Sequence, residues 1–152
     1  MDFWKTCADF YDGPILEMSC GTGRILLPLS QLGYDITGVD ISNPMLAELK
    51  QKILNCPHDV RCKIHLIQGN MVDKILSGNY NLLNFAVSTF LALKNDDERL
   101  ACLKSCNQVL SDNGVIILSN SKFETNIIRP TALEEANPEK EIIIEYGNDK
   151  KN

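Results

Sequence analysis

Two carboxylates and a pair of glycines stand close together near the start of the chain. Glu17 ends a short apolar run, Gly21 and Gly23 follow it in the sequence Cys-Gly-Thr-Gly, and Asp40 ends the next apolar run. Glycine lets the backbone approach a ligand closely and adopt torsion angles that other residues avoid. A carboxylate at the tip of a neighbouring strand is placed to accept hydrogen bonds from a ribose diol. This pattern predicts a nucleoside-binding site.

Two features of this stretch distinguish between kinds of nucleoside ligand. The dinucleotide fingerprint G-x-G-x-x-G would need a third glycine where this chain has Leu26. Glu17 would place a carboxylate beside a pyrophosphate, which costs energy in a site of reduced dielectric, whereas a carboxylate beside an ammonium or sulfonium group is favourable. S-adenosylmethionine carries both cationic groups and no phosphate. We therefore expect S-adenosylmethionine as the cofactor, with an NAD-binding Rossmann domain as the less favoured alternative.

These side chains must be positioned by strands and helices that alternate along the chain. Such alternation is typical of a parallel sheet covered by helices, and we predict an α/β fold with a doubly wound, mostly parallel sheet. Ser42-Asn43-Pro44 predicts a helix start, and so does the capping-box pattern of residues 95–98. The predicted strands are 14–18, 34–39, 61–67, 81–87, 115–118 and 141–146, and the predicted helices are 23–32, 42–53, 71–76 and 95–110.

Four segments in order resemble the motifs of class I S-adenosylmethionine-dependent methyltransferases. Glu17–Arg24 (EMSCGTGR) resembles the first motif of that family, with Ser19 where many members carry the first glycine, and Gly33–Ser42 (GYDITGVDIS) resembles the second motif. Gln68–Met71 (QGNM) resembles the segment around the adenine, and residues 98–118 resemble the helix and turn before the fifth strand. The resemblance implies the Rossmann-like methyltransferase fold.

The resemblance also implies which part of the cofactor each segment contacts. The glycine loop and Glu17 would hold the methionine part, Asp40 the ribose, Asn70 the exocyclic nitrogen of the adenine, and the segment after the fourth strand the sulfonium and the methyl acceptor. The expected cofactor-binding residues are Glu17, Ser19, Gly21, Thr22, Gly23, Arg24, Asp40, Ile41, Met45, Asn70, Met71, Val72, Ala86, Ser88 and Phe90.

Several positions keep two interpretations at this stage. Met45 and Met71 are equally well explained as ligand contacts and as plain core residues. Trp4 and Tyr11 either form a lid over the cofactor or pack on the sheet. Asn81 stands where the family usually has an acidic residue at the start of the fourth strand, and we expect this change to remove a local hydrogen bond.

Composition and charge limit the classes of partner. The formal net charge is -5 and the basic residues are scattered, so we expect no binding to nucleic acid or to anionic membranes. No apolar run approaches the ~20 residues of a membrane span, and the first residues do not resemble a signal peptide, so the expected location is cytoplasmic. Cys56, His58, Cys62 and His65 match no closed zinc module, and we expect no metal site.

The expected function is methyl transfer from S-adenosylmethionine to an unidentified small molecule. In-line displacement at the sulfonium methyl depends mainly on a near-attack geometry of the acceptor, and no residue stands out as a catalytic base. The alternative is a non-catalytic S-adenosylmethionine-binding module or an inactive methyltransferase fragment.

The length of the chain shapes the expected domain organisation. The family's sheet usually has seven strands, yet only 34 residues follow Leu118. We therefore expect a single domain over 1–152, with a core at 14–118 and an incomplete part at 119–152 in which the C-terminal strands are truncated. A truncated chain, a natural fragment and a homodimer completed through an open sheet edge all remain as interpretations.

Overall fold

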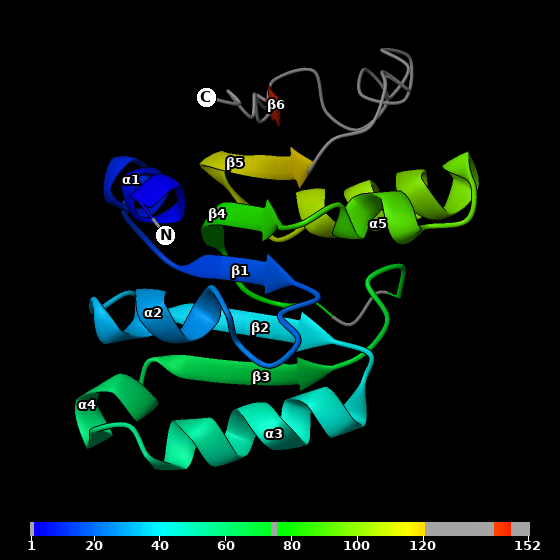
Figure 1. The fold of residues 1–152 in the computed structure, drawn as a ribbon. Helices are drawn as coiled ribbons and strands as arrows, with labels where there is room; N and C mark the ends of the chain where they lie inside the picture. Colours follow the sequence, from blue (N-terminus) through cyan, green and yellow to red (C-terminus); the bar gives the residue numbers. More distant parts are fainter. Residues whose placement is uncertain (1, 74–75, 121–141, 147–152) are drawn as a thin grey trace, which may run out of the picture.

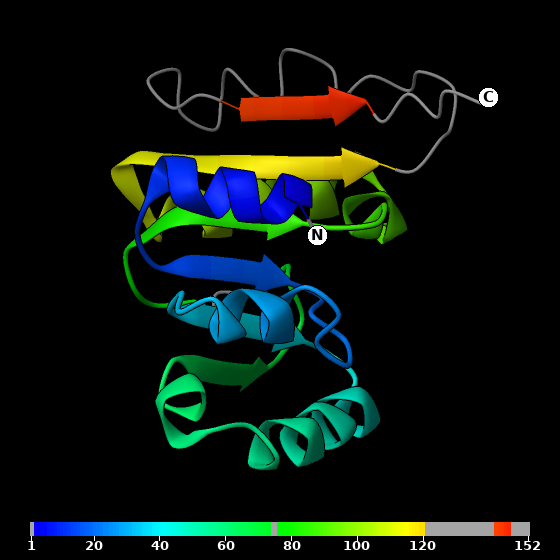
Figure 2. The ribbon, with the colours of Figure 1, turned by 60° about the vertical axis from the view of Figure 1, so that its left-hand side comes forward.

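The fold is built around a parallel sheet whose strands are joined by crossover connections. The computed structural model describes residues 2–73, 76–120 and 142–146. The strand order is β3-β2-β1-β4-β5-β6, and every pairing within these residues is parallel, as the arrows show for β1–β5 in Figure 1 and for β6 in Figure 2. The elements are α1 (Asp2–Tyr11), β1 (Ile15–Met18), α2 (Leu26–Gln31), β2 (Ile36–Asp40), α3 (Asn43–Leu54), α4 (His58–Arg61), β3 (Ile64–Gln68), β4 (Tyr80–Phe85), the 3-10 helix η1 (Thr89–Ala92), α5 (Asp96–Asn107), β5 (Leu110–Asn120) and β6 (Ile142–Tyr146).

The winding direction of the chain reverses between β1 and β4. Strands β2 and β3 lie on one side of β1, whereas β4, β5 and β6 lie on the other. Figure 2 shows α1 and α2 in front of the sheet and α5 behind it. The predicted doubly wound α/β fold is thereby confirmed. The reversal creates a switch point at the carboxyl ends of β1 and β4, which is where ligands bind in sheets of this kind.

Two apolar clusters, one on each face of the sheet, hold the layers together. Alternate residues of each strand enter opposite clusters: Ile15 packs with α1, α2 and α3, whereas Leu16 packs with α5. Leu82 and Leu83 of β4 divide in the same way. Strands covered on both faces are largely apolar, and this explains the apolar runs in the sequence.

The first helix packs on the sheet. Trp4 is 8% exposed and belongs to the core cluster of β1 and β4, which decides between the two interpretations of this residue in favour of packing. Asn81 does not lose a hydrogen bond, contrary to our expectation. Its side-chain amide donates to the carbonyl of Asp12 at 2.6 Å and to that of Tyr11 at 3.2 Å. The amide therefore fixes the end of α1 to the start of β4, a role that an acidic side chain could not fill in the same way because it has no donor.

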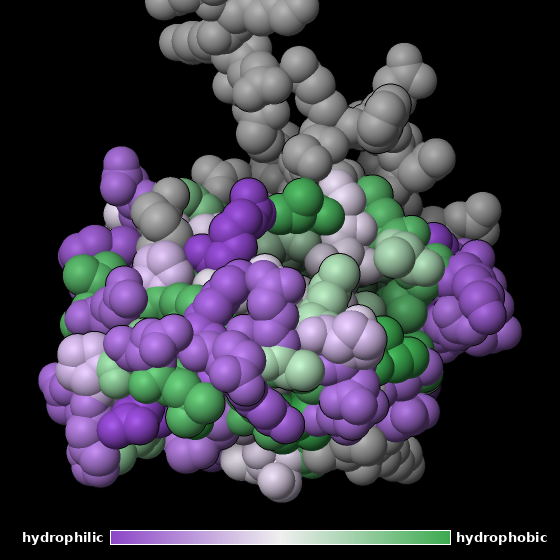
Figure 3. All heavy atoms as spheres, turned by 60° about the horizontal axis from the view of Figure 1, so that its bottom comes forward, coloured by the Kyte–Doolittle hydropathy of each residue, from purple (hydrophilic) through white to green (hydrophobic). Residues whose placement is uncertain are grey.

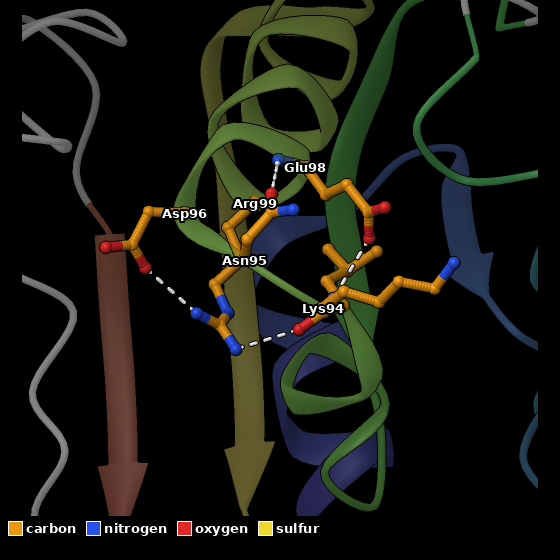
Figure 4. Close-up of polar contacts among 6 residues, drawn as sticks. Lys94, Asn95, Asp96, Glu98 and Arg99 are labelled. Atoms are coloured by element: carbon orange, nitrogen blue, oxygen red, sulfur yellow. Dashed lines mark hydrogen bonds and ion pairs between the residues drawn. The ribbon is translucent and has the colours of Figure 1, made fainter.

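Both predicted capped helix starts are confirmed. The hydroxyl of Ser42 accepts a hydrogen bond from the Met45 N–H at 3.4 Å and begins α3. At α5, Asn95 Oδ1 accepts from the Glu98 N–H at 2.9 Å, and Glu98 Oε2 accepts from the Lys94 N–H at 2.9 Å (Figure 4). The Asn95 bond satisfies a donor that the first turn of a helix otherwise leaves unpaired, and the Glu98 bond ties the residue before the cap to the same turn.

The predicted helix 23–32 begins later than expected. Gly21 and Gly23 both have positive φ, so the chain turns before it becomes helical at Leu26. Pro28 therefore lies in the first turn of α2, where its missing N–H breaks no helical hydrogen bond. Gly33 has φ +102°, as expected for a residue that closes a helix.

Two other helix predictions need correction. Residues 71–73 form a turn instead of a helix, and residues 74–75 lie outside the described part. The short helix α4 was not predicted, and its last residue, Arg61, was wrongly placed at the start of the predicted strand 61–67. The predicted strand 141–146 is confirmed as β6, which pairs with β5, while residues 121–141 and 147–152 lie outside the described part.

Hydrophilic side chains predominate on the face that carries α3 and α4, with hydrophobic side chains scattered between them (Figure 3). Exposed residues of α3 include Glu48, Lys50 and Lys52. Of the helices within the described ranges, none combines the length and the apolar character that a bilayer span requires.

Candidate functional site

The residues predicted to bind a cofactor lie at one end of the sheet. Glu17 and Asp40 belong to the ends of β1 and β2, and the others lie in the segments that follow β1, β2, β3 and β4. Parallel strands end at the same edge, so loops far apart in sequence come together there. The switch point between β1 and β4 lies in the middle of this edge.

The loop between β1 and α2 turns tightly through left-handed backbone. The φ angles are +54° at Ser19, +55° at Gly21 and +84° at Gly23. A Cβ on Gly23 would lie 2.4 Å from Leu49 Cδ1, so glycine is required there for packing against α3. A Cβ on Gly21 would have only Met45 Sδ within 4 Å, at 3.7 Å. The space beside Gly21 is therefore open to a ligand, whereas Gly23 serves the packing.

Asp40 connects this loop to the start of α3. Its Oδ2 accepts a hydrogen bond from the Gly21 N–H at 2.8 Å, and its Oδ1 accepts one from the Ser42 N–H at 2.8 Å. The side chain is 7% exposed. Each carboxylate oxygen can accept a second hydrogen bond, so the two loop contacts leave capacity for the hydroxyls of a ribose.

Glu17 is a buried carboxyl group beneath the same loop. It is 3% exposed, and its Oε2 has no hydrogen-bond partner. Burial raises the pKa of Glu17 to about 8, and the nearby charge of Asp40 acts in the same direction. A hydrogen bond from the Leu26 N–H and the positive charge of Arg24 oppose this rise. The group is therefore largely uncharged near neutral pH and has an unused acceptor.

Cys20 in this loop is not set up as a nucleophile. Burial, and then the charges of Glu17 and Asp40, raise the pKa of the Cys20 thiol to about 12. A thiol of this kind stays protonated and unreactive. The residue instead packs in the core cluster of α2 and α3.

The residues expected around an adenine differ in how far their side chains are exposed. Ile41 is 66% exposed and Met45 is 48% exposed, so both have apolar surface free to cover a ring. Asn70 Oδ1 accepts a hydrogen bond from the Val72 N–H at 3.2 Å, which stabilises the turn after β3. Met71 and Val72 pack against the α5 core cluster. For Met71 the core interpretation is thus supported, and a ligand contact stays a prediction.

The chain bends sharply after β4. Val87 and Ser88 both have left-handed backbone, with φ +54° and +60°. The Val87 N–H donates to Ser119 Oγ at 3.2 Å and the Ser88 N–H donates to the Ser119 carbonyl at 3.0 Å. The end of β5 therefore holds the loop that follows Ala86 in a conformation that a β-branched residue rarely adopts.

Two of the predicted binding residues have other surroundings than expected. Phe90 is 3% exposed, and its ring packs edge-on against Phe85 with centroids 5.3 Å apart, within the core. Arg24 is exposed and acts on Glu17 through its charge. A cofactor contact of either residue stays a prediction.

Two residues of this region were missed by sequence reasoning. Asn84 is completely buried and stands in register with Glu17 on the neighbouring strand. Its signal was present, because an asparagine interrupts the apolar run of β4. Ser119 holds the loop after β4, but it lies where the sequence pattern weakens, and no residue type marked it.

The cysteines and histidines of residues 56–65 do not gather in one place. Cys62 follows α4, with its Sγ 3.5 Å from His58 Nδ1. His65 of β3 lies beside Asp35, with 3.5 Å between Nε2 and Oδ1. Within the described ranges, no three His, Cys, Asp or Glu side chains are grouped as metal ligands.

Comparison with known proteins identifies relatives of this domain. The profile of the family described as "Methyltransferase domain" matches residues 15–114. The chain is 27% identical over 120 residues to YqeM of Bacillus subtilis (strain 168), whose name describes a methyltransferase; the match covers 78% of this chain and 47% of that protein. It is 26% identical over 104 residues to the cypemycin N-terminal methyltransferase of Streptomyces sp, over 68% of this chain and 40% of that protein.

A solved structure agrees with these sequence matches. The glycopeptide N-methyltransferase MtfA, complexed with S-adenosyl-L-methionine, superposes with a TM-score of 0.74 at 26% identity. The superposition covers 81% of this chain and 54% of that one. The chain thus spans about half the length of the relatives it matches.

Proposed function

Because the chain belongs to the methyltransferase domain family, we propose that its site binds S-adenosylmethionine and serves the transfer of its methyl group to a small molecule. Family membership supports the reaction class, and the binding of S-adenosyl-L-methionine by MtfA supports the cofactor. The acceptor is proposed as a small molecule because two similar structures are described as a glycopeptide N-methyltransferase and an amino pentose methyltransferase.

The single observation that carries the proposal is the arrangement of two carboxyl groups around an open glycine. Asp40 holds the loop at Gly21 and keeps acceptor capacity toward hydroxyl groups. Glu17 lies beneath the loop with an unpartnered Oε2, which suits a cationic ligand better than a phosphate. The residues present therefore fit a nucleoside that carries a ribose and positive charge.

The bound cofactor would supply an electrophilic methyl group on a positively charged sulfur. The chain itself would bind and orient: Asp40 the ribose, Glu17 the cationic end, and the exposed side chains of Ile41 and Met45 the adenine. The bend held by Ser119 would border the acceptor. Orientation of this kind contributes most of the rate in a displacement between two bound reactants, so the proposal needs no dedicated base.

The proposal predicts that Asp40→Asn weakens binding of S-adenosylhomocysteine by about 10- to 100-fold, because a charge-assisted hydrogen bond to the ligand is lost. Asparagine keeps one carbonyl oxygen for the loop, so thermal denaturation should show a folded variant. Asp59→Asn, at an exposed position of α4, is the matched control and should leave the affinity unchanged. Equal affinity in both variants would contradict the role of Asp40.

Methyl transfer itself is tested by a separate assay. Formation of S-adenosylhomocysteine from S-adenosylmethionine, followed across a panel of small amines, alcohols and short peptides, should show turnover with at least one acceptor. Binding of the cofactor without turnover on any acceptor would favour the non-catalytic module instead.

A further inference from the structure

Three buried side-chain atoms within the described residues have no hydrogen-bond partner, and they belong to two adjacent side chains. The atoms are Oε2 of Glu17 and both Oδ1 and Nδ2 of Asn84. Native proteins leave few buried polar groups unpaired, because each costs roughly 1–3 kcal/mol of desolvation. An amide with both ends unpaired beside a half-satisfied carboxyl group therefore calls for a physical reason.

The sheet places the two side chains next to each other. Glu17 of β1 pairs in register with Asn84 of β4, so both project from the same face of adjacent strands, which lie about 4.8 Å apart in a sheet. The next residue toward the loop on that face of β4 is Ala86, which is buried and too small to separate the amide from the candidate site. The pair thus lies directly under the switch point.

An amide is suited to a carboxyl group that changes its charge. Its oxygen can accept a hydrogen bond from a protonated carboxyl, and its NH2 group can donate to a carboxylate. Asn84 can therefore serve Glu17 in both states by a rotation of its own side chain. A leucine or valine at this position would suit neither state.

We propose that Asn84 is a positioning residue for Glu17, and that binding of the cationic cofactor displaces the carboxyl proton of Glu17 to solvent while Asn84 turns its NH2 group toward the resulting carboxylate. The proposal rests on the proposed function and adds a proton to the binding equilibrium. One O–H bond breaks, the proton passes to the buffer, and the carboxylate remains beside the positive charge of the ligand.

The charges around Glu17 agree with this exchange. Burial raises its pKa to about 8, and Asp40 at the end of β2 adds to the rise. Arg24, on the loop above, and the Leu26 N–H lower it. The Cys20 thiol of the same loop stays neutral at this pH, because its own pKa is raised to about 12.

Three helices pack over this face. α2 contains no titratable side chain, and among the buried residues of α1 only Cys7 could ionise. α3 brings one cation to the loop: Lys52 Nζ donates to the Thr22 carbonyl at 3.2 Å and is paired with Glu48 at 2.8 Å. A bound cation would thus be the main new charge near the carboxyl group, and it would lower the pKa of Glu17. The affinity should rise with pH up to about pH 8, where the free protein begins to ionise on its own.

The test is calorimetric titration of the full chain with S-adenosylhomocysteine, which lacks the sulfonium charge but keeps the ammonium group of the cofactor, at pH 7 in buffers of different ionisation enthalpy. The wild-type protein should release about one proton per ligand bound, because the free carboxyl is mostly protonated there and the bound one is not. Glu17→Gln should bind without any dependence on the buffer. Ser30→Ala, a buried substitution in α2 on the same face, should keep the proton release and controls for general core damage.

The role of Asn84 is tested with a pair of variants that leave similar space. Asn84→Ala removes both hydrogen-bonding ends, whereas Asn84→Ser keeps a hydroxyl that can donate and accept. We expect Asn84→Ala to lower the affinity about tenfold at pH 7 and to shift its pH profile upward, and Asn84→Ser to restore part of both. If the affinity of Asn84→Ala and that of Asn84→Ser depended on pH in the same way, the role of Asn84 would be overturned, even if both variants lose stability.

A second readout uses the protein without ligand. In the folded protein the pKa of Glu17 is raised from its ordinary value of 4.5 to about 8. The neutral carboxyl group therefore contributes its full stabilisation below about pH 4.5, and this stabilisation is lost as the pH rises toward about 8. The midpoint of urea unfolding should therefore fall over this range in the wild-type protein relative to Glu17→Gln. If the urea midpoints of the wild-type protein and of Glu17→Gln changed with pH in the same way, the result would contradict a buried, neutral Glu17 carboxyl group.

The outcomes separate the inference from the function. Tight binding of S-adenosylhomocysteine without any dependence on the buffer would overturn the inference and leave the proposed function intact. Absence of binding in every buffer would overturn the proposed function.

Discussion

At Val87 a β-branched residue adopts left-handed backbone, and the same torsion continues through Ser88. Such a conformation costs of order 1–3 kcal/mol and persists only where the surroundings determine it. Here two hydrogen bonds to Ser119 do so. The bend lies at the end of β4, beside the switch point, so the strain is located where the proposed acceptor would enter. Strain is a known feature of functional sites, and this bend fits that pattern.

Val87→Gly should stabilise the protein by about 1 kcal/mol, because glycine adopts positive φ without a steric penalty. Val87→Ala keeps a Cβ and should gain less. The 52% exposure of Val87 means that either variant loses little apolar burial. Urea denaturation gives the order of stability, expected as glycine, alanine, valine. A lower free energy of unfolding for Val87→Gly than for the wild-type protein would show that the side chain, and not the backbone, determines stability at this bend.

At the scale of elements, the regular parts of the fold could be predicted from the sequence, and the bends could not. The apolar runs predicted the strands because both faces of the sheet are covered, and the caps at Ser42 and Asn95 marked two helices correctly. The start of α2 was placed too early, because the positive φ at Gly23 is a property of backbone packing that residue type alone does not reveal. The predicted helix 71–76 was wrong over residues 71–73, which form a turn, because tertiary contacts override local preference.

In the candidate site, too, some features could be predicted from the sequence and others could not. Its backbone frame and the two carboxylates could be predicted because they lie at strand ends marked by glycine and by the change from apolar to polar residues. Asn84 and Ser119 could not be assigned a role, since each acts through a neighbour on another strand. Knowledge of the strand order was needed to bring them together with Glu17 and Val87.

Gly38 illustrates how one element positions another. A Cβ at this position of β2 would lie 2.5 Å from Leu26 Cδ1 and 2.7 Å from Cys20 Sγ. We predict that Gly38→Ala destabilises the protein by about 2 kcal/mol, because it pushes the glycine loop and α2 away from the sheet.

A double-mutant cycle with Leu26→Ala tests this cause. Removal of the Leu26 methyl groups makes room for the new Cβ, so the double variant should be more stable than the sum of the single changes implies. Strictly additive free energies of unfolding would show that the contact with Leu26 is not responsible.

For the molecule as a whole, the described residues form part of a methyltransferase domain, and nucleoside binding by this part is what we propose. The family match covers residues 15–114, and the chain spans about half the length of its relatives. The segments that border the acceptor in the proposed mechanism come from the loop after β4 and from the end of β5. A small-molecule acceptor, a cytoplasmic location and a homodimer through a sheet edge stay predictions from the sequence.

The most direct test of the central claim is the affinity of the unmodified chain for two competing nucleosides, measured by calorimetry under identical conditions. The arrangement of Glu17, Gly21 and Asp40 predicts that S-adenosylhomocysteine binds at least about tenfold more tightly than NAD, a difference of about 1.4 kcal/mol. Tighter binding of NAD would contradict the account, because it would mean that the buried carboxyl group tolerates a diphosphate better than a cation.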